Sequence, residues 1–178
     1  MHEVTHMEKP IRLAGIVRES IVDGPGFRFT VFVQGCPHHC PGCHNPQTHD
    51  PAGGEDCDVE TIMDEFVKDP LLQGLTLSGG EPMEQAEALL PLARAVRALG
   101  KNVVVFSGYT FEELLEKGKR DPAVLDLLRE CFLLVDGRFV LAQRDLTLLF
   151  RGSRNQRLID VPRSLESGTA VLYEPRTC

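Results

Sequence analysis

Three cysteines lie close together in the segment Cys36-Pro37-His38-His39-Cys40-Pro41-Gly42-Cys43. Thiolates this close can bind one metal centre, whereas a disulfide between two of them would leave the third without a partner. A structural zinc ion normally has four protein ligands. The segment therefore predicts either a zinc site that a histidine (His38, His39 or His44) completes, or a four-iron cluster with one iron open to a non-protein ligand.

The residues around the cysteines resemble a known signature. The spacing of Cys36, Cys40 and Cys43 is similar to the cluster loop of the radical S-adenosylmethionine enzymes. Asp23-Gly24-Pro25-Gly26-Phe27-Arg28 precedes this loop and Asn45 follows it, as in the glycyl-radical activating enzymes of that superfamily. The resemblance implies that the three cysteines bind a 4Fe-4S cluster. It also implies that S-adenosyl-L-methionine binds the open iron through its amine and carboxylate.

A second motif, Gly79-Gly80-Glu81-Pro82, follows the apolar run Leu75 to Leu77. It is similar to the family motif that contacts the amino group of the methionine moiety. Glycines let the backbone approach a ligand closely, and the Glu81 carboxylate can accept hydrogen bonds from an ammonium group. The alternative is that the glycines only form a tight turn before the next helix. Two motifs in the family's order favour the iron-sulfur interpretation over zinc.

The cysteine segment also indicates a subgroup. In much of the superfamily the residue before the third cysteine is aromatic and lies beside the adenine, but here it is Gly42. Cys40-Pro41-Gly42-Cys43 with Asn45 instead resembles the activating proteins of the anaerobic ribonucleoside-triphosphate reductase. On this resemblance, His44 is the candidate to stack on the adenine.

Two segments nearer the C-terminus support the same subgroup. Arg151-Gly152-Ser153-Arg154-Asn155-Gln156-Arg157 is similar to a stretch of those activating proteins, and Val135-Asp136-Gly137-Arg138-Phe139 adds to the match. The resemblance thus extends from about residue 11 to about residue 160. The alternative for the arginine-rich segment is a solvated loop, or one that docks an acidic partner surface.

Length and composition bound the remaining possibilities. The chain has 178 residues, a single-domain length that is short for a complete eight-fold α/β barrel. We therefore expect one radical S-adenosylmethionine domain over residues 1–178, folded as a partial, open β/α barrel. The net charge is −7 and basic residues form no run, which argues against nucleic-acid and membrane binding. With no signal peptide or membrane-spanning run, a soluble cytoplasmic protein is expected. Cys131 is expected in the core, and Cys57 and Cys178 have no assigned role.

The apolar pattern predicts strands that alternate with helices, and hence a parallel sheet with crossover helices. Asp50 to Asp58 is expected to be a surface connection and Leu158 to Tyr173 an irregular tail with a strand, while Pro91 is expected to bend or divide its helix. The expected strands are Ile11 to Ser20, Phe27 to Gln34, Leu75 to Leu77, Val103 to Phe106, Phe132 to Asp136 and Leu146 to Phe150. The expected helices are Val59 to Lys68, Glu84 to Leu99, Phe111 to Lys117 and Ala123 to Glu130.

Several polar loops follow predicted strands and should meet at the carboxyl edge of the sheet. Ser107 is a candidate to bind the carboxylate or ribose of the cofactor, Asp136 or Arg138 to reach the same groups, and Arg151 to bind the carboxylate. Surface salt bridges would explain the two arginines equally well. The candidate cofactor-binding set is therefore Gly79, Gly80, Glu81, Ser107, Asp136, Arg138, Arg151 and His44, beside the metal ligands Cys36, Cys40 and Cys43.

The resemblance implies a radical reaction on another protein. An electron from a donor such as flavodoxin or ferredoxin would cleave S-adenosyl-L-methionine to methionine and a 5′-deoxyadenosyl radical. The radical would then abstract hydrogen from a glycine of the partner reductase. Three alternatives stay open, namely activation of another glycyl-radical enzyme of the formate-lyase type, radical chemistry on a small molecule, and a zinc or iron-sulfur binding module without turnover.

Overall fold

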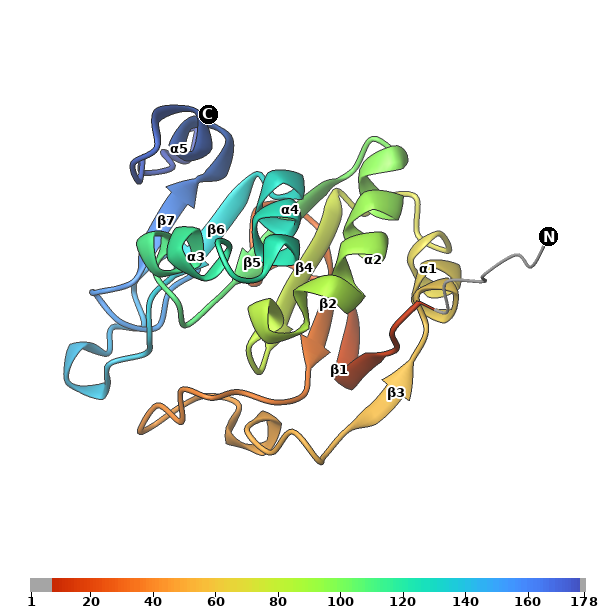
Figure 1. The fold of residues 1–178 in the computed structure, drawn as a ribbon, viewed down its shortest axis with the longest axis horizontal. Coiled ribbons are helices and arrows are strands. Elements are labelled where there is room, and N and C mark those ends of the chain that lie inside the picture. The colour runs from red at the N-terminus through yellow and green to blue at the C-terminus, as the bar shows by residue number, and fades with distance from the viewer. Residues whose placement is uncertain (1–7, 177–178) are drawn as a thin grey trace.

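The computed structural model describes residues 8–176, so Cys178 lies outside the described part. Its centre is a seven-stranded sheet in the order β3-β1-β2-β4-β5-β6-β7 (Figure 1). The four central strands β2, β4, β5 and β6 are parallel, as the sequence predicts. The strands are β1 (Ile11–Ser20), β2 (Arg28–Val33), β3 (Glu55–Cys57), β4 (Gly74–Gly79), β5 (Asn102–Phe106), β6 (Leu133–Asp136) and β7 (Arg157–Asp160).

The sheet is not parallel throughout, which corrects the prediction. Strand β1 runs antiparallel to both β2 and β3, and β7 runs antiparallel to β6. The connection between β1 and β2 spans only residues 21–27, and a parallel pairing would need a crossover of about a dozen residues or more. The short Asp-Gly-Pro-Gly turn therefore forces an antiparallel pair.

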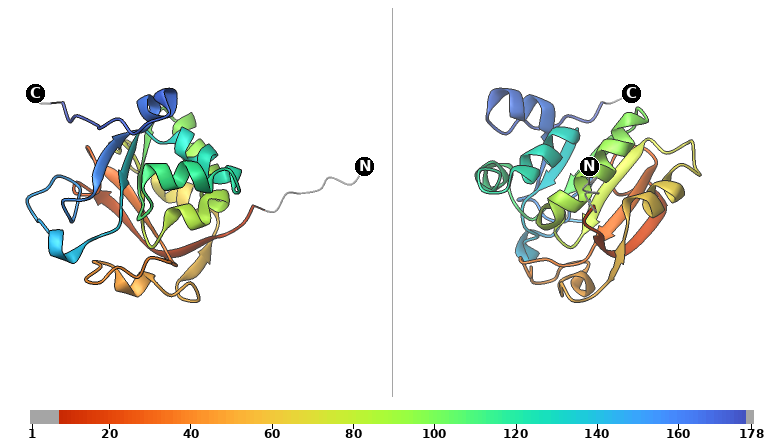
Figure 2. Two further views of the ribbon diagram at one scale, coloured as in Figure 1. Left: turned by 60° about the vertical axis from the view of Figure 1, so that its left-hand side comes forward. Right: turned by 45° about the vertical axis from the view of Figure 1, so that its right-hand side comes forward.

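Four helices cover one face of the sheet (Figures 1 and 2). Strand residues such as Phe29, Val31, Val103 and Val105 point to this side and are fully buried with the apolar faces of the helices. Cys131 is 3% exposed and belongs to this core, as predicted. The helices are α1 (Val59–Phe66), α2 (Ala86–Ala98), α3 (Phe111–Lys117) and α4 (Pro122–Glu130), and α5 (Val161–Ser167) follows β7.

The opposite face of the sheet carries a smaller apolar cluster. Alternation along β5 and β6 places Val104, Leu133 and Val135 on this side, where Phe106 and Phe150 pack against them. The chain between β6 and β7 crosses here without a long helix and contains only the 3₁₀ turn Leu141–Gln143. This face therefore remains accessible to ligands.

Four further predictions differ from the structure in detail. Pro91 does not divide its helix, because α2 continues through it as one helix, and the run Leu146 to Phe150 forms turns in place of a strand. The expected surface connection contains β3, and the expected tail contains α5. Helix α5 forms because Asp160 caps its N-terminus at Arg163 N (3.1 Å) and Gly168 ends it in a left-handed conformation. No helix among residues 8–176 is long and apolar enough to cross a lipid bilayer.

Candidate metal centre

The cysteine segment forms a loop whose two ends are joined at the carboxyl end of β2. Gly35 N donates to Thr48 O (2.7 Å) and Cys36 N donates to His49 O (3.1 Å), so the chain returns alongside itself after the 3₁₀ turn Pro46–Thr48. Inside the loop, Cys43 N donates to Cys40 O (3.1 Å). These bonds hold the three cysteines on one short, closed loop at the edge of the sheet.

The three cysteines line one cavity of about 130 Å³, together with Gly79 and Gly80. Among residues 8–176, no three His, Cys, Asp or Glu side chains are grouped as the ligands of a single ion. In a 4Fe-4S cluster each thiolate binds a different iron, so the sulfur ligands stand farther apart than around one ion. The residues present fit such a cluster, and burial raises the pKa of the Cys36 thiol.

Glu81 connects the cysteine loop to the loops after β4 and β5. Its carboxylate is fully buried, and Oε2 accepts hydrogen bonds from His38 Nε2 (2.8 Å) and Gly108 N (2.8 Å). Its Oε1 accepts from Ser107 Oγ (2.8 Å) and Met83 N (3.0 Å). An ammonium group would therefore have to compete with four donors of the protein for this carboxylate.

The two glycines before Glu81 allow close packing against β2. Gly79 has φ +96°, and a Cβ there would lie 2.6 Å from Val33 N. A Cβ on Gly80 would lie 2.3 Å from Gly35 O, next to the first cysteine. Any larger residue would displace the cysteine loop, so these glycines shape the cavity as well as line it.

A second, larger cavity of about 620 Å³ adjoins the first on the sheet face without α1 to α4. The two share Cys43, Ser78, Phe106, Phe139 and Gln156 as lining residues. A volume of this size falls in the range of small-molecule sites, roughly 300–1,000 Å³. The cavity extends from the third cysteine toward the turn between β1 and β2.

Comparison with known proteins decides the family. Residues 22–159 match the family described as a 4Fe-4S single cluster domain. The chain is 39% identical over 147 residues to the anaerobic ribonucleoside-triphosphate reductase-activating protein of Escherichia coli K12, covering 76% of this chain and 90% of the relative. The chain belongs to this activating-protein family.

Relatives occur beyond bacteria. The protein of the same name from Enterobacteria phage T4 is 32% identical over 145 residues, covering 77% of this chain and 86% of the relative. Among solved structures, the crystal structure of QueE from Escherichia coli matches with a TM-score of 0.42 at 20% identity, covering 59% of this chain and 54% of that chain. That last likeness is too partial to add to the family assignment.

The structure brings some of the predicted site residues together. Ser107 lines the smaller cavity with the cysteines and the two glycines, and His44 and Arg151 line the larger one. The His44 ring packs on Phe139, with ring centres 5.2 Å apart. These residues gather because the loops after β2, β4 and β5 and the segment before β7 meet at one edge of the sheet.

Two predicted residues lie in ion pairs outside the two cavities. Asp136 is fully buried, and its two carboxylate oxygens accept hydrogen bonds from Arg157 Nε (3.0 Å) and Nη2 (2.6 Å). Phe111 N also donates to this carboxylate (2.8 Å). Arg138 pairs with Glu113 (3.0 Å) and lies over the ring of Tyr109 (5.8 Å). Both contacts bind α3 to the end of the sheet.

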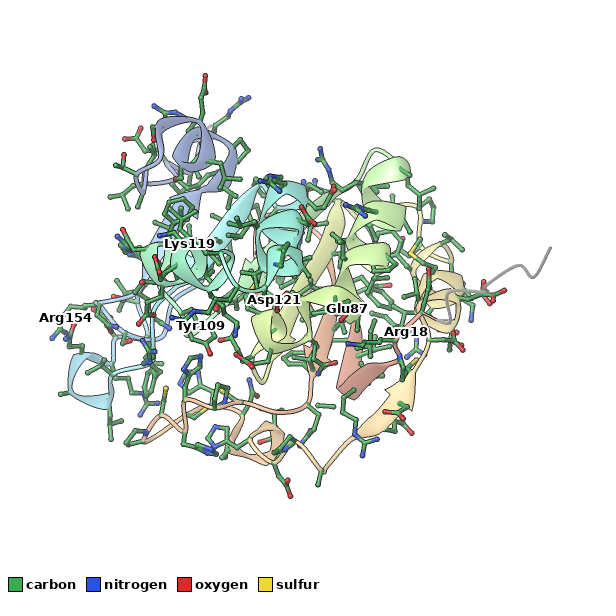
Figure 3. All side chains as sticks on the ribbon, in the orientation of Figure 1. Arg18, Glu87, Tyr109, Lys119, Asp121 and Arg154 are labelled. Carbon is green, nitrogen blue, oxygen red and sulfur yellow. The ribbon has the colours of Figure 1, made fainter. Side chains whose placement is uncertain are left out.

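Tyr109, labelled in Figure 3, lies between helix α3 and the cysteine loop. Its ring meets the His38 ring edge-on, with centres 4.6 Å apart. Its hydroxyl donates to Glu84 Oε1 (2.6 Å), which Lys117 also contacts (3.0 Å). Burial and the neighbouring Glu84 carboxylate raise the pKa of Tyr109. The sequence does not single out Tyr109, because only tertiary contacts connect it to the loop.

The arginine-rich motif folds the segment that covers the larger cavity. Gln156 Oε1 accepts from Gly152 N (2.8 Å) and Ser153 N (3.1 Å), and its amide donates to Gly137 O (3.0 Å). The buried Ser153 hydroxyl donates to Asn155 Oδ1 (2.6 Å) and accepts from Val140 N (3.1 Å). The motif is therefore a set of internal hydrogen bonds that gives the segment its shape, and not a solvated loop.

The upstream motif occupies the opposite end of the larger cavity. Asp23 lines this cavity, and its Oδ2 accepts from Ser20 Oγ (2.6 Å). Arg28 is fully buried, donates to Leu75 O (2.7 Å) and Asn102 Oδ1, and has no carboxylate partner among residues 8–176. Burial lowers the pKa of Arg28 to about 10. Arg28 thereby ties β2 to β4 and β5 at their amino ends.

Proposed function

We propose that this chain is a radical S-adenosylmethionine enzyme that activates an anaerobic ribonucleoside-triphosphate reductase. A 4Fe-4S cluster held by the three cysteines would supply one electron for reductive cleavage of S-adenosyl-L-methionine. The products would be methionine, 5′-deoxyadenosine and a radical on a glycine α-carbon of the reductase. The observation that carries the proposal is that Cys36, Cys40 and Cys43 line a small cavity that adjoins one of nucleoside size. The names of the relatives supply the identity of the reductase.

The chain's own residues divide into ligands and supports. The three cysteines hold the cluster, and the Gly79–Gly80 backbone and Ser107 lie beside it to receive the methionine end of the cofactor. His44 and Arg151 face the larger cavity, where the adenosine end would lie. For Glu81, Asp136 and Arg138, the hydrogen bonds inside the protein favour holding these loops in place over direct contact with the cofactor.

The architecture supports an open β/α barrel formed by one domain. The parallel strands β2, β4, β5 and β6 carry helices on one face and the larger cavity on the other. In a closed barrel, side chains would fill this inner face. An open side leaves room for a protein segment.

Apolar side chains around the larger cavity support a peptide substrate. Ile21 and Val22 are each 70% exposed, Leu146 is 73% exposed, and all three line the cavity. Exposed apolar residues grouped at an opening are typical of surfaces that bind another protein. A glycine-bearing loop of the reductase would lie against them. The electron donor, a flavodoxin or ferredoxin, and the cytoplasmic location remain predictions from the sequence.

Anaerobic reconstitution with iron and sulfide tests the proposal. We expect about four irons per chain, a brown chromophore and reductive cleavage of S-adenosyl-L-methionine. Cys40→Ala should lose the cluster and cleavage together, whereas Cys57→Ala, on the edge strand β3, should keep both. Stoichiometric zinc without cleavage, or unimpaired cleavage by Cys40→Ala, would contradict the proposal.

A further inference from the structure

His49 brings an unsatisfied ring nitrogen to the cysteine cavity. Its side chain lines the cavity with Cys36, Cys40 and Cys43. Its Nε2 is buried and forms no hydrogen bond within residues 8–176. Buried polar atoms almost always have a partner, because leaving one unpaired is costly. A ligand in the cavity would supply the missing partner.

The backbone fixes His49 relative to the first cysteine. His49 O accepts from Cys36 N (3.1 Å), and its own N donates to Pro46 O (3.2 Å) at the end of the 3₁₀ turn. The His39 ring meets the His49 ring edge-on, with centres 5.1 Å apart. The backbone of His49 is therefore held beside Cys36 at the base of the loop, and its ring packs on that of His39.

The other histidines of the loop are placed differently. His38 is bonded to Glu81, and His44 packs on Phe139 at the larger cavity. His39 and His49 pack on each other, but His39 does not line the cavity that the three cysteines line. Of the two histidines that do line it, His38 and His49, only His49 has a buried ring nitrogen without a hydrogen bond. This makes His49 the histidine best placed to meet a group held by the three thiolates.

We propose that His49 Nε2–H donates a hydrogen bond to a sulfur of the cluster and raises the cluster's reduction potential. This inference rests on the proposed function, because it needs a cluster on the three cysteines. Reduction adds negative charge to the cluster, so a donor beside its sulfurs stabilises the reduced state more than the oxidised state. The residue tunes how readily the cluster accepts the electron that the reaction consumes.

A redox titration of the reconstituted protein, followed by electron paramagnetic resonance (EPR) without S-adenosyl-L-methionine, tests this role. His49→Phe keeps an aromatic ring but removes the donor, so its midpoint potential should fall below that of the wild type. His49→Gln restores an N–H and should recover part of the shift. His39→Phe is the matched control and should titrate like the wild type. An unchanged potential in His49→Phe with full iron content would overturn the inference.

A second measurement applies if the phenylalanine variant fails to hold iron. Pulsed EPR of wild-type protein labelled with ¹⁵N-histidine should show a weak nitrogen coupling that His49→Gln lacks. No coupling, or a strong coupling that indicates direct ligation of iron, would overturn the inference. Failure of the wild type to bind any cluster would instead contradict the proposed function, so the two failures are distinguishable.

Discussion

His38 Nε2 lies 2.8 Å from Glu81 Oε2, and both side chains are almost completely buried, at 5% and 0% exposed. His38 lies between the first two cysteines, and Glu81 follows the glycines that line the same cavity. One hydrogen bond therefore joins the two motifs that the sequence analysis treats as separate. Because Ser107 and Gly108 bind the same carboxylate, Glu81 holds three loops at fixed positions around the cavity.

Replacing Glu81 should loosen the cysteine loop even without a cluster. Glu81→Gln replaces one carboxylate oxygen, which accepts two hydrogen bonds, with an NH2 group that can only donate. Two of the four donors around Glu81 therefore lose their acceptor. We expect the free energy of unfolding to fall by about 2–4 kcal/mol. Urea denaturation and hydrogen exchange of residues 35–49 measure the effect. Glu60→Gln, on the exposed side of α1, is the control and should change little. Equal stability of the two variants would show that the Glu81 contacts contribute nothing.

The glycine motif should tolerate no Cβ. Gly79→Ala combines a positive φ with a contact of 2.6 Å to backbone, and we expect it to cost about 2–4 kcal/mol and to impair cluster binding. Gly100 also has a positive φ of +75°, but a Cβ there meets no atom within 4 Å. Gly100→Ala therefore isolates the backbone strain and should cost about 1–2 kcal/mol. Iron content and thermal denaturation of both variants check this, and similar losses would rule out a packing role for Gly79.

A charge among the exposed apolar residues at the larger cavity, such as Ile21 and Val22, should impair activation of the reductase without impairing cleavage of S-adenosyl-L-methionine. Ile21→Asp and Val22→Asp alter exposed side chains, so the fold, the iron content and reductive cleavage of S-adenosyl-L-methionine should be retained. Glycyl-radical formation on the reductase should fall by about tenfold, equivalent to roughly 1.4 kcal/mol of binding. Leu71→Asp is the control, since Leu71 is 73% exposed but lies before β4 and outside the larger cavity. If all three variants activate the reductase equally, the substrate loop binds elsewhere.

The pair between Asp136 and Arg157 should determine stability and not cofactor affinity. Asp136→Ala removes one of the two carboxylates that hold the Arg157 guanidinium and leaves Phe111 N without its acceptor. Because the Arg157 side chain is 34% exposed and keeps its contact with Glu112 (2.6 Å), we expect a cost of about 1–3 kcal/mol. Arg157→Lys keeps the positive charge but cannot form the bidentate hydrogen bond, so it should lower the free energy of unfolding by less than Asp136→Ala does. At a temperature where both variants are folded, the KM for S-adenosyl-L-methionine should stay near the wild-type value. A large rise in KM with unchanged stability would instead support direct contact of Asp136 with the cofactor.

Local patterns predict the central part of the fold well. The apolar runs of β4, β5 and β6 are short and bounded by glycine or polar residues, and α3 begins at a Thr110–Glu113 capping box, so sequence alone locates them. The cysteine spacing is likewise a local signal. The sequence does not predict strand β3 because it is short and polar. It does not predict helix α5 because that helix has only seven residues and buries only Val161 and Ser164, which leaves no apolar stripe to detect.

The partners of the polar residues depend on the tertiary structure. Asp136 and Arg157 are 21 residues apart, and His38 and Glu81 are 43 apart, so nothing in the local sequence connects them. From the sequence, Glu81 and Asp136 are predicted to bind a ligand, whereas in the structure each accepts hydrogen bonds from donors of other elements. His49 was overlooked for the same reason, since only the return of the chain beside Cys36 brings it to the cavity.

The most direct test of the central claim is an EPR measurement on the reduced, reconstituted protein mixed with S-adenosyl-L-methionine and the anaerobic ribonucleoside-triphosphate reductase. We predict a glycyl-radical doublet from the reductase that appears with the wild-type chain and is absent with Cys40→Ala. A chain that cleaves S-adenosyl-L-methionine but never produces this signal on the reductase would contradict the proposed function.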